Sequence, residues 1–292
     1  MGMPVPHKFG LSDLRQARAK GRKLAMLTCY DYTTARLMHE VGVPMILVGD
    51  SAANVILGHA TTLPVSLEFM IEITRAVRRG APDALLIADM PFGSVHGSLA
   101  RSVRNVVKVV QQTGCDMVKI ETTPRSARLI TELADAGVAV MAHLGLKPQS
   151  IHVLGSYRYQ ARTAAEARQL IDEALSMERA GAAALLLEAV PPEVSELLVR
   201  RSRLPVVGCG AGPACHASVV VTHDLLGLTT TAPRFVPVLS DLATKMKTAF
   251  SEFMGQLQNG AYPASEHCYS MPPAEREALL KTVDDTTMMK RS

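Results

Sequence analysis

The sequence predicts a single (β/α)8 TIM barrel over residues 1–270, followed by a polar C-terminal tail over residues 271–292. The 292-residue chain is 48% hydrophobic and 20% charged, which supplies a large core and excludes disordered and disulfide-scaffold proteins. A barrel of this class takes about 250 residues, so one domain accounts for most of the length. Short aliphatic runs alternate with longer amphipathic segments, and this alternation indicates a parallel sheet covered by helices.

Continuous aliphatic runs mark the predicted strands, because they lack the polar alternation of a sheet with one solvated face. The recurring order of strand, helix and strand fits either an open doubly wound sheet or a closed barrel. A weaker eighth candidate around residues 227–229 favours the barrel. The stronger runs cover residues 24–27, 45–48, 84–88, 117–120, 138–141, 183–187 and 204–207.

Capping signals mark the ends of the predicted helices. Ser66 precedes a helix that ends at Gly80, directly after Arg78 and Arg79. Thr163 and Glu166 have the spacing of a capping box, ahead of a helix that stops at Gly181. Within the tail, a short helical pattern spans residues 274–283.

Charge, apolar runs and cysteines exclude several classes of protein. The net charge is +4, aromatic residues are 4% and Trp is absent, which argues against a nucleic-acid partner. No apolar run reaches the ~18 residues of a membrane helix, and the N-terminus lacks the apolar segment of a signal peptide. We therefore expect a cytoplasmic protein without a membrane partner. The five cysteines lack zinc or redox spacing, which predicts reduced thiols.

Polar side chains follow several of the predicted strands at the point where each strand ends. These residues are Asp50, Asp89, Glu121, His143 and Glu188. In a barrel the C-terminal ends of the strands converge on one mouth, so residues far apart in sequence face one small space. A single carboxylate at a strand end can instead cap a helix or pair with a lysine. Four carboxylates together predict a functional site.

Clustered carboxylates indicate a bound cation, because like charges at close range need a divalent metal, a protonated member or both. Oxygen ligands without a cysteine or histidine pair favour Mg²⁺ or another hard cation. Asp50, Asp89 and Glu121 are the predicted ligands. Lys119 lies two residues before Glu121 and shares its face of the strand. Its ammonium group can anchor a substrate carboxylate or form an internal ion pair with Glu121 or Asp89.

A glycine loop over residues 208–212 follows the seventh run. Its glycines permit either a close approach of the backbone to a ligand or a turn with a purely steric role. The loop lacks the Lys and Ser/Thr of a nucleoside-triphosphate loop.

Several long segments, in order along the chain, carry a resemblance to a known family. They include MLTCYDYTTARL, ILVGDS, GHATTLPVS, LLIADMPFGS, AHLGLKPQS, LLLEAVPP and THDLLGL. Over residues 11–269 the chain resembles ketopantoate hydroxymethyltransferase. The resemblance implies a barrel that binds Mg²⁺ and a branched 2-oxo acid, and that takes a one-carbon unit from 5,10-methylenetetrahydrofolate in pantothenate biosynthesis. It also implies a homo-oligomer, a decamer in many members.

The resemblance implies a role for each residue at the predicted mouth. Glu188 matches the catalytic base, and Lys119 and Ser51 match contacts to the substrate carboxylate. Asp50 and Asp89 match metal-binding and substrate-binding positions. Glu121 matches the acidic residue near the metal, and His143 matches a residue of the site wall. The chain departs from the family pattern at Ala52-Ala53-Asn54, Thr122-Thr123 and His216-Ala217-Ser218. Loops set substrate choice on this fold, so these departures bear on which oxo acid and which donor are used.

Two other functions remain open on sequence grounds. The phosphoenolpyruvate mutase and isocitrate lyase group uses Mg²⁺-bound 2-oxo acids for carbon–carbon lyase or mutase chemistry without folate, but its Lys-x-Cys-Gly-His loop is absent. A non-catalytic paralogue is the second alternative. The retained cluster of charges argues against it, because buried like charges are costly to keep without a use.

Overall fold

The computed structural model describes residues 7–289, and the environment of side chains as far as residue 281. The chain forms two compact units, Met1–Ser240 and Asp241–Ser292. The expected boundary at residue 270 stays a prediction. In the part of the chain that is described, no helix is both long and apolar enough to cross a membrane.

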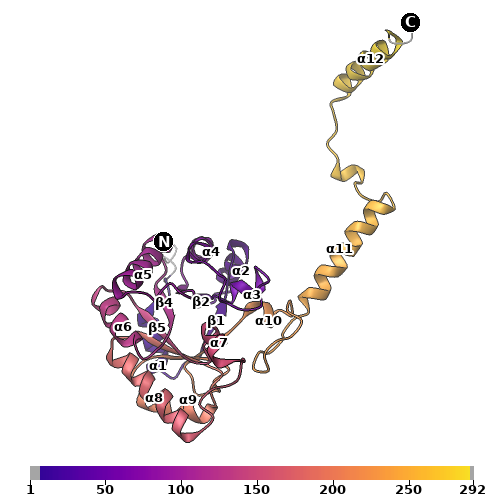
Figure 1. The fold of residues 1–292 in the computed structure, drawn as a ribbon. Helices are drawn as coiled ribbons and strands as arrows, with labels where there is room; N and C mark the ends of the chain where they lie inside the picture. The colour runs from indigo at the N-terminus through magenta and orange to yellow at the C-terminus, as the bar shows by residue number, and fades with distance from the viewer. Residues whose placement is uncertain (1–6, 290–292) are drawn as a thin grey trace, which may run out of the picture. The chain divides into compact units, whose positions relative to one another are not determined.

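The first unit is a closed barrel of parallel strands, which confirms the predicted fold class (Figure 1). Each strand pairs with the next in sequence, and β1 closes the barrel against β8 with Leu24 beside Ala217. The strands are β1 (Leu24–Thr28), β2 (Met45–Val48), β3 (Leu85–Asp89), β4 (Met117–Glu121), β5 (Val140–Gly145), β6 (Ala184–Glu188), β7 (Val206–Cys209) and β8 (Ala217–Val220).

The position predicted for the eighth strand was wrong. Residues 227–229 form a turn beyond α10, and β8 occupies residues 217–220 instead. In β8 the buried Ala217 and Val219 alternate with the exposed Ser218. The segment therefore lacks the continuous apolar run by which the other strands were found. Loop 210–216, which joins β7 to β8, contains no helix.

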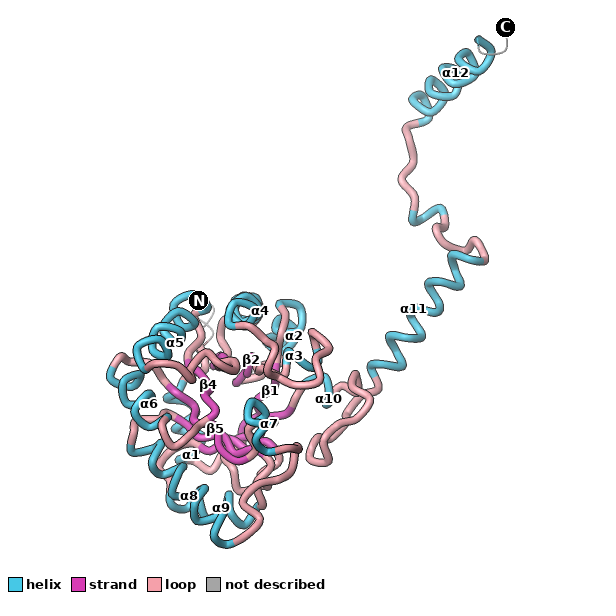
Figure 2. The backbone as a smooth tube through the Cα atoms, viewed as in Figure 1, coloured by secondary structure: helices cyan, strands magenta, loops and turns pink. Residues whose placement is uncertain are grey.

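Helices surround the barrel, and Figure 2 shows them in cyan outside the magenta strands. The predicted caps are confirmed: Ser66 accepts a hydrogen bond from the Phe69 amide, and Thr163 and Glu166 form a capping box. The barrel unit contains α1 (Leu11–Ala19), α2 (Tyr32–Glu40), α3 (Ala52–Val55), α4 (Leu67–Gly80), α5 (Leu99–Thr113), α6 (Ser126–Asp135), α7 (Ile151–Leu154), α8 (Ala164–Arg179), α9 (Pro192–Arg201) and α10 (Thr222–Leu225), with a 3-10 turn at Pro148–Ser150. The second unit contains α11 (Leu242–Gln258), a 3-10 turn at Ser265–His267 and α12 (Pro273–Met289), which includes the helical pattern predicted in the tail.

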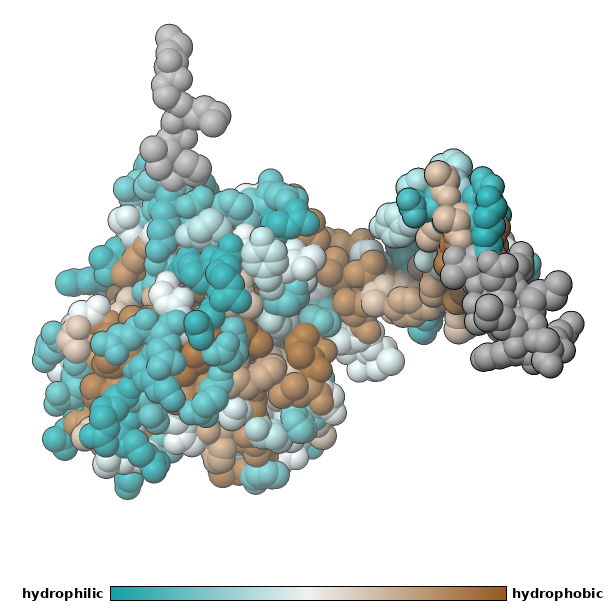
Figure 3. All heavy atoms as spheres, turned by 90° about the horizontal axis from the view of Figure 1, so that it is seen from above, coloured by the Kyte–Doolittle hydropathy of each residue, from teal (hydrophilic) through white to brown (hydrophobic). Residues whose placement is uncertain are grey.

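The core has two layers. Side chains on the outer face of the strands pack against the helices, while Met26, Ile87, Met141 and Leu186 belong to a separate cluster inside the barrel. Leu14 of α1 joins the inner cluster and is fully buried. The apolar cluster supports the polar site at the C-terminal end of the strands. Hydrophilic residues cover much of the surface seen in Figure 3.

A half-buried arginine ties the N-terminal ends of β3 and β4 together. The Arg78 guanidinium donates to the carbonyl oxygens of Gly114 at 3.1 Å and Ala84 at 3.0 Å, and to Asp116 Oδ2 at 2.5 Å. The same Asp116 oxygen accepts from the Leu86 amide at 2.9 Å. These contacts lie at the end of the barrel away from its mouth, where residues contribute to stability rather than to catalysis.

Arg78→Met should lower the free energy of unfolding by about 2–3 kcal/mol, because several half-buried acceptors lose their donor. Activity per folded molecule should stay unchanged. The matched control is Arg75→Met, since Arg75 forms an exposed pair with Glu72 on the same helix; its cost should be at most about 0.5 kcal/mol. Urea unfolding of both variants measures the difference, and equal losses would contradict the role assigned to Arg78.

Candidate functional site

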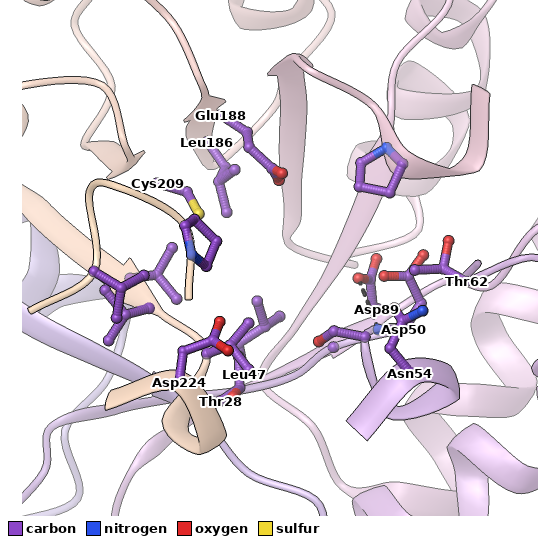
Figure 4. Close-up of a pocket in the computed structure, with 18 of the residues that line it drawn as sticks. Thr28, Leu47, Asp50, Asn54, Thr62, Asp89, Leu186, Glu188, Cys209 and Asp224 are labelled. Atoms are coloured by element: carbon purple, nitrogen blue, oxygen red, sulfur yellow. Dashed lines mark hydrogen bonds between the residues drawn. The ribbon is translucent and has the colours of Figure 1, made fainter. Parts of the chain in front are cut away.

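A cavity of about 170 Å³ opens at the C-terminal end of the barrel. Its lining includes Asp50, Asp89, Lys119 and Glu188 from the ends of different strands, together with Ser51. Figure 4 shows Asp50, Asp89 and Glu188 around this cavity. The structure therefore brings these predicted site residues to one cavity, as the convergence of strand ends requires.

Lys119 and Asp89 form a buried ion pair between neighbouring strands. Lys119 Nζ lies 2.5 Å from Asp89 Oδ2, and the same oxygen accepts from the Asp50 amide at 3.2 Å. Burial alone would lower the pKa of Lys119, but the carboxylates of Asp89, Asp50 and Glu121 outweigh burial and raise it. Burial raises the pKa of Asp89, and the Lys119 ammonium opposes this rise. Of the two roles predicted for Lys119, the internal ion pair is present.

Glu121 lies beside this cluster and is held by the backbone. Both of its carboxyl oxygens accept from the backbone N–H of Gln149, at 3.1 and 3.2 Å. Burial raises the pKa of Glu121 to about 9, against the opposing effect of Lys119. The Gln149 side chain donates to Asp50 Oδ2 at 2.8 Å and to the Met90 carbonyl at 3.0 Å. Gln149 thus connects two of the acidic residues.

Glu188 faces the cavity with His143 beside it. Its side chain keeps 20% of its surface exposed, and Oε2 lies 3.2 Å from His143 Nε2. Burial raises the pKa of Glu188 to about 7. Burial and the nearby Lys119 lower the pKa of His143 well below its usual value, so its ring is neutral. Glu188 can consequently take up or release a proton close to neutral pH.

The backbone around Glu188 is tightly constrained. A Cβ at Gly145 would lie 2.3 Å from the Glu188 carbonyl oxygen, and that oxygen accepts from the Leu146 amide at 2.8 Å. The next residue, Ala189, has a φ of +48°, in the left-handed region that costs a residue with a Cβ about 1–2 kcal/mol. The close approach of β5 and β6 thereby fixes the position from which the Glu188 side chain starts.

Ser51 is paired with a buried tyrosine that the sequence analysis did not select. The hydroxyl groups of Ser51 and Tyr30 lie 2.8 Å apart. The segments MLTCYDYTTARL and AHLGLKPQS contain Tyr30 and Gln149, but nothing in the residue pattern distinguishes them from core residues. Asp224, in THDLLGL, was also missed; it lines the cavity from α10.

The glycine loop packs against protein side chains. A Cβ at Gly210 would lie 2.5 Å from the Phe235 ring, and one at Gly212 would lie 2.5 Å from Pro192. These contacts therefore support a purely steric role for the glycines of this loop. The cysteines are free in the structure, as predicted.

Asp50 and Asp89 can together hold a hard cation. Asp89 Oδ1 is buried and forms no hydrogen bond among the described residues. Mg²⁺ commonly uses one or two protein carboxylates, with water and substrate oxygens completing its shell. Asp50 and Asp89 fit that requirement, although residues 7–281 contain no group of three or more His, Cys, Asp or Glu side chains arranged for a metal. Glu121 as a further ligand stays a prediction.

The sequence is similar to one well-defined family. The family model described as ketopantoate hydroxymethyltransferase matches residues 8–265. A relative from Koribacter versatilis (strain Ellin345), named 3-methyl-2-oxobutanoate hydroxymethyltransferase, is 42% identical over 279 residues, which cover 95% of this chain and 94% of the relative. A protein of the same name from Chloroflexus aggregans (strain MD-66 / DSM 9485) is 41% identical over 277 residues, which cover 94% of this chain and 99% of the relative.

Solved structures with a similar fold have lower sequence identity. Phosphoenolpyruvate phosphomutase from Streptomyces platensis subsp. rosaceus has a TM-score of 0.59 at 14% identity, and the match covers 97% of this chain and 98% of that one. 2,3-Dimethylmalate lyase, a PEP mutase/isocitrate lyase superfamily member, has a TM-score of 0.57 at 15% identity, with 99% of each chain covered. At these identities the likeness shows the fold alone.

Gly145→Ala should lower the free energy of unfolding by about 1–3 kcal/mol more than Gly114→Ala. Both glycines have positive φ, +89° and +64°, but a Cβ at Gly114 meets nothing within 4 Å. The difference between the two variants reports the clash with the Glu188 backbone and the Val190 side chain. Thermal and urea unfolding measure it; equal destabilisation would show that β5 and β6 can separate without cost.

Proposed function

The chain belongs to the ketopantoate hydroxymethyltransferase family, and on this basis we propose the reaction that its site carries out. The protein is a 3-methyl-2-oxobutanoate hydroxymethyltransferase, which forms 2-dehydropantoate in pantothenate biosynthesis. The donor of the one-carbon unit is 5,10-methylenetetrahydrofolate, and the cofactor is Mg²⁺. The observation that carries the proposal is the position of Glu188, whose pKa is raised to about 7, on the small cavity that Asp50, Asp89 and Lys119 also line.

The cavity suits a small branched 2-oxo acid. At about 170 Å³ it is smaller than the roughly 300–1,000 Å³ of typical pockets for drug-sized ligands. Leu47, Leu186, Val219 and Val220 supply an apolar part of the lining, which can contact the branched alkyl group. The acidic and basic groups line the same space and are available to the oxo-acid end.

The charged groups bind and orient the substrate. Asp50 and Asp89 would hold the cation, with Glu121 beside them, and Mg²⁺ bound there supplies polarisation of the keto group, which makes the neighbouring C–H more acidic. Lys119 uses one of its three N–H donors for Asp89, so it has donors left for the substrate carboxylate. Ser51, held by Tyr30, is a second contact for that carboxylate.

Glu188 acts as the base. It takes the proton from the carbon next to the keto group, and that carbon then forms the new bond to the methylene carbon of the donor. Both carbon–nitrogen bonds of that methylene group break, water supplies the hydroxyl oxygen of the product, and tetrahydrofolate leaves. A raised pKa matches a base to work near neutral pH. His143, whose Nε2 lies 3.2 Å from Glu188 Oε2, is neutral and adds no charge that would hold the pKa of Glu188 down.

Family membership also supports a cytoplasmic homo-oligomer, with a decamer as the expected form. Light scattering at micromolar concentration tests the assembly, and the mass of a monomer would contradict it.

Proton exchange tests the first half of the reaction without folate. In heavy water containing Mg²⁺ and 3-methyl-2-oxobutanoate, the protein should replace the C–H next to the keto group with deuterium, followed by NMR. Chelating the metal should abolish the exchange, because no other group supplies equivalent charge stabilisation. Adding 5,10-methylenetetrahydrofolate should yield 2-dehydropantoate. Folded protein supplied with Mg²⁺ that exchanges no 2-oxo acid would favour the non-catalytic alternative.

Glu188→Gln should reduce the exchange rate by about 10²- to 10⁴-fold, because the amide cannot accept the proton. Binding of the oxo acid, measured by calorimetry, should persist. The control is Glu193→Gln, an exposed glutamate in the first turn of α9, which should leave exchange unchanged. Near-normal exchange by Glu188→Gln would remove Glu188 from the role of base.

The kcat/KM for exchange should rise with pH with a midpoint of about 7, because kcat/KM reports the ionisation of Glu188 in the free enzyme. Below that value Glu188 is protonated and cannot act as a base, so the rate at pH 6 should be about one tenth of the plateau. A midpoint near the ordinary value for glutamate would show that burial does not set the basicity of this group.

A further inference from the structure

A second cavity, of about 620 Å³, adjoins the substrate cavity. Both are formed by the barrel unit, and the walls they have in common are made by Ser51, Asn54, Tyr157, Val221, Asp224 and Pro233. We refer to it as the outer cavity. A different cavity, between α5 and α6, shares none of its lining with the substrate cavity.

The proposed reaction requires the donor to occupy space continuous with the substrate. Atoms that form a bond must approach to about 3–3.5 Å beforehand. The substrate cavity is too small to hold a folate as well, whereas the outer cavity has the volume of a site for a drug-sized molecule. The shared wall is therefore where the two reactants meet.

Asp224 supplies the carboxyl group of that shared wall. It is buried, and Figure 4 shows it pointing into the cavity from α10. Thr229 Oγ1 donates to its Oδ1 at 2.6 Å, while no described group donates to Oδ2. Oδ2 is not among the buried side-chain atoms that lack a partner, so it is accessible from the cavity. Since no step of the mechanism uses Asp224, its free oxygen is available to a ligand with N–H groups.

The lining of the outer cavity selects the part of the donor that enters. It contains Asp224 but no lysine or arginine, so it is unsuited to the anionic glutamate tail of a folate. The pterin head is uncharged, and its pyrimidine edge presents an amino group next to a ring N–H. Two such parallel donors match a carboxylate. Tyr157, half-exposed on the same wall, offers an aromatic face to a flat bicyclic ring.

We propose that the outer cavity binds the pterin head of the folate donor, and that Asp224 recognises it by accepting hydrogen bonds from its amino-pyrimidine edge. This assignment rests on the proposed function, which names the donor. It leaves the glutamate tail on the solvent side of the outer cavity and directs the one-carbon unit toward Glu188 and the bound oxo acid.

Asp224→Asn tests this assignment. The amide can still accept from Thr229, but it presents an N–H to the donors of the pterin. We expect the KM for 5,10-methylenetetrahydrofolate and the Kd for 5-formyltetrahydrofolate, measured by calorimetry, to rise at least about tenfold. Deuterium exchange of 3-methyl-2-oxobutanoate without folate should stay within about twofold of the wild type, because that step is assigned to the metal, Lys119 and Glu188 and not to Asp224. Asp172→Asn, an exposed carboxylate on α8, is the charge-matched control and should change neither quantity.

The outcomes separate this inference from the proposed function. Wild-type exchange and transfer test the function itself, whereas the difference between folate binding and exchange in Asp224→Asn tests the outer cavity. Unchanged folate binding in that variant would overturn the assignment. A parallel loss of exchange would also overturn it, because Asp224 would then act on the oxo acid or on folding. Failure of the wild type to bind 5-formyltetrahydrofolate would refute a folate site here.

Discussion

The buried ion pair between Lys119 and Asp89 is the constraint on which the site depends. Their atoms approach to 2.5 Å above an inner core that is otherwise apolar. Without the ammonium, the carboxylates of Asp89 and Asp50 would lack a counter-charge where few waters can solvate them, at a cost of several kcal/mol. The register of β3 and β4 places Asp89 directly beside Lys119. This register decides whether the mouth of the barrel can hold ionised carboxylates.

The Lys119 ammonium does not offset the effect of burial on the pKa equally at every neighbouring carboxyl group. Lys119 opposes the effect of burial on Asp89, Glu121 and Glu188, yet burial still raises the pKa of each. The pKa of Glu121 reaches about 9, whereas that of Glu188 reaches about 7. Side chains of the same chemical type therefore differ in protonation at one pH. Such a difference allows one group to accept a proton while its neighbour holds one.

The sequence predicted the barrel and much of its mouth, because strand-end residues converge whatever the details of packing. It placed the eighth strand wrongly, since β8 alternates in burial and follows a loop without a helix. Gln149, Tyr30 and Asp224 escaped prediction for a different reason. Their roles arise from contacts across the fold, such as the bond from Gln149 to Asp50, ninety-nine residues away. A strand-end pattern carries no information about such partners.

The constrained backbone at Glu188 also determines how this active site can be redesigned. Because Gly145 leaves no room beside the Glu188 carbonyl and Ala189 adopts a left-handed conformation, loop grafts after β5 or β6 would move the base. In the segment Ala52–Val55 after β2, Ala52 and Ala53 are fully buried, whereas Asn54 is half-buried and lines both cavities. Libraries intended to change substrate range are therefore best centred on Asn54, with Asp50, Ser51 and the β5–β6 side of the mouth kept unaltered.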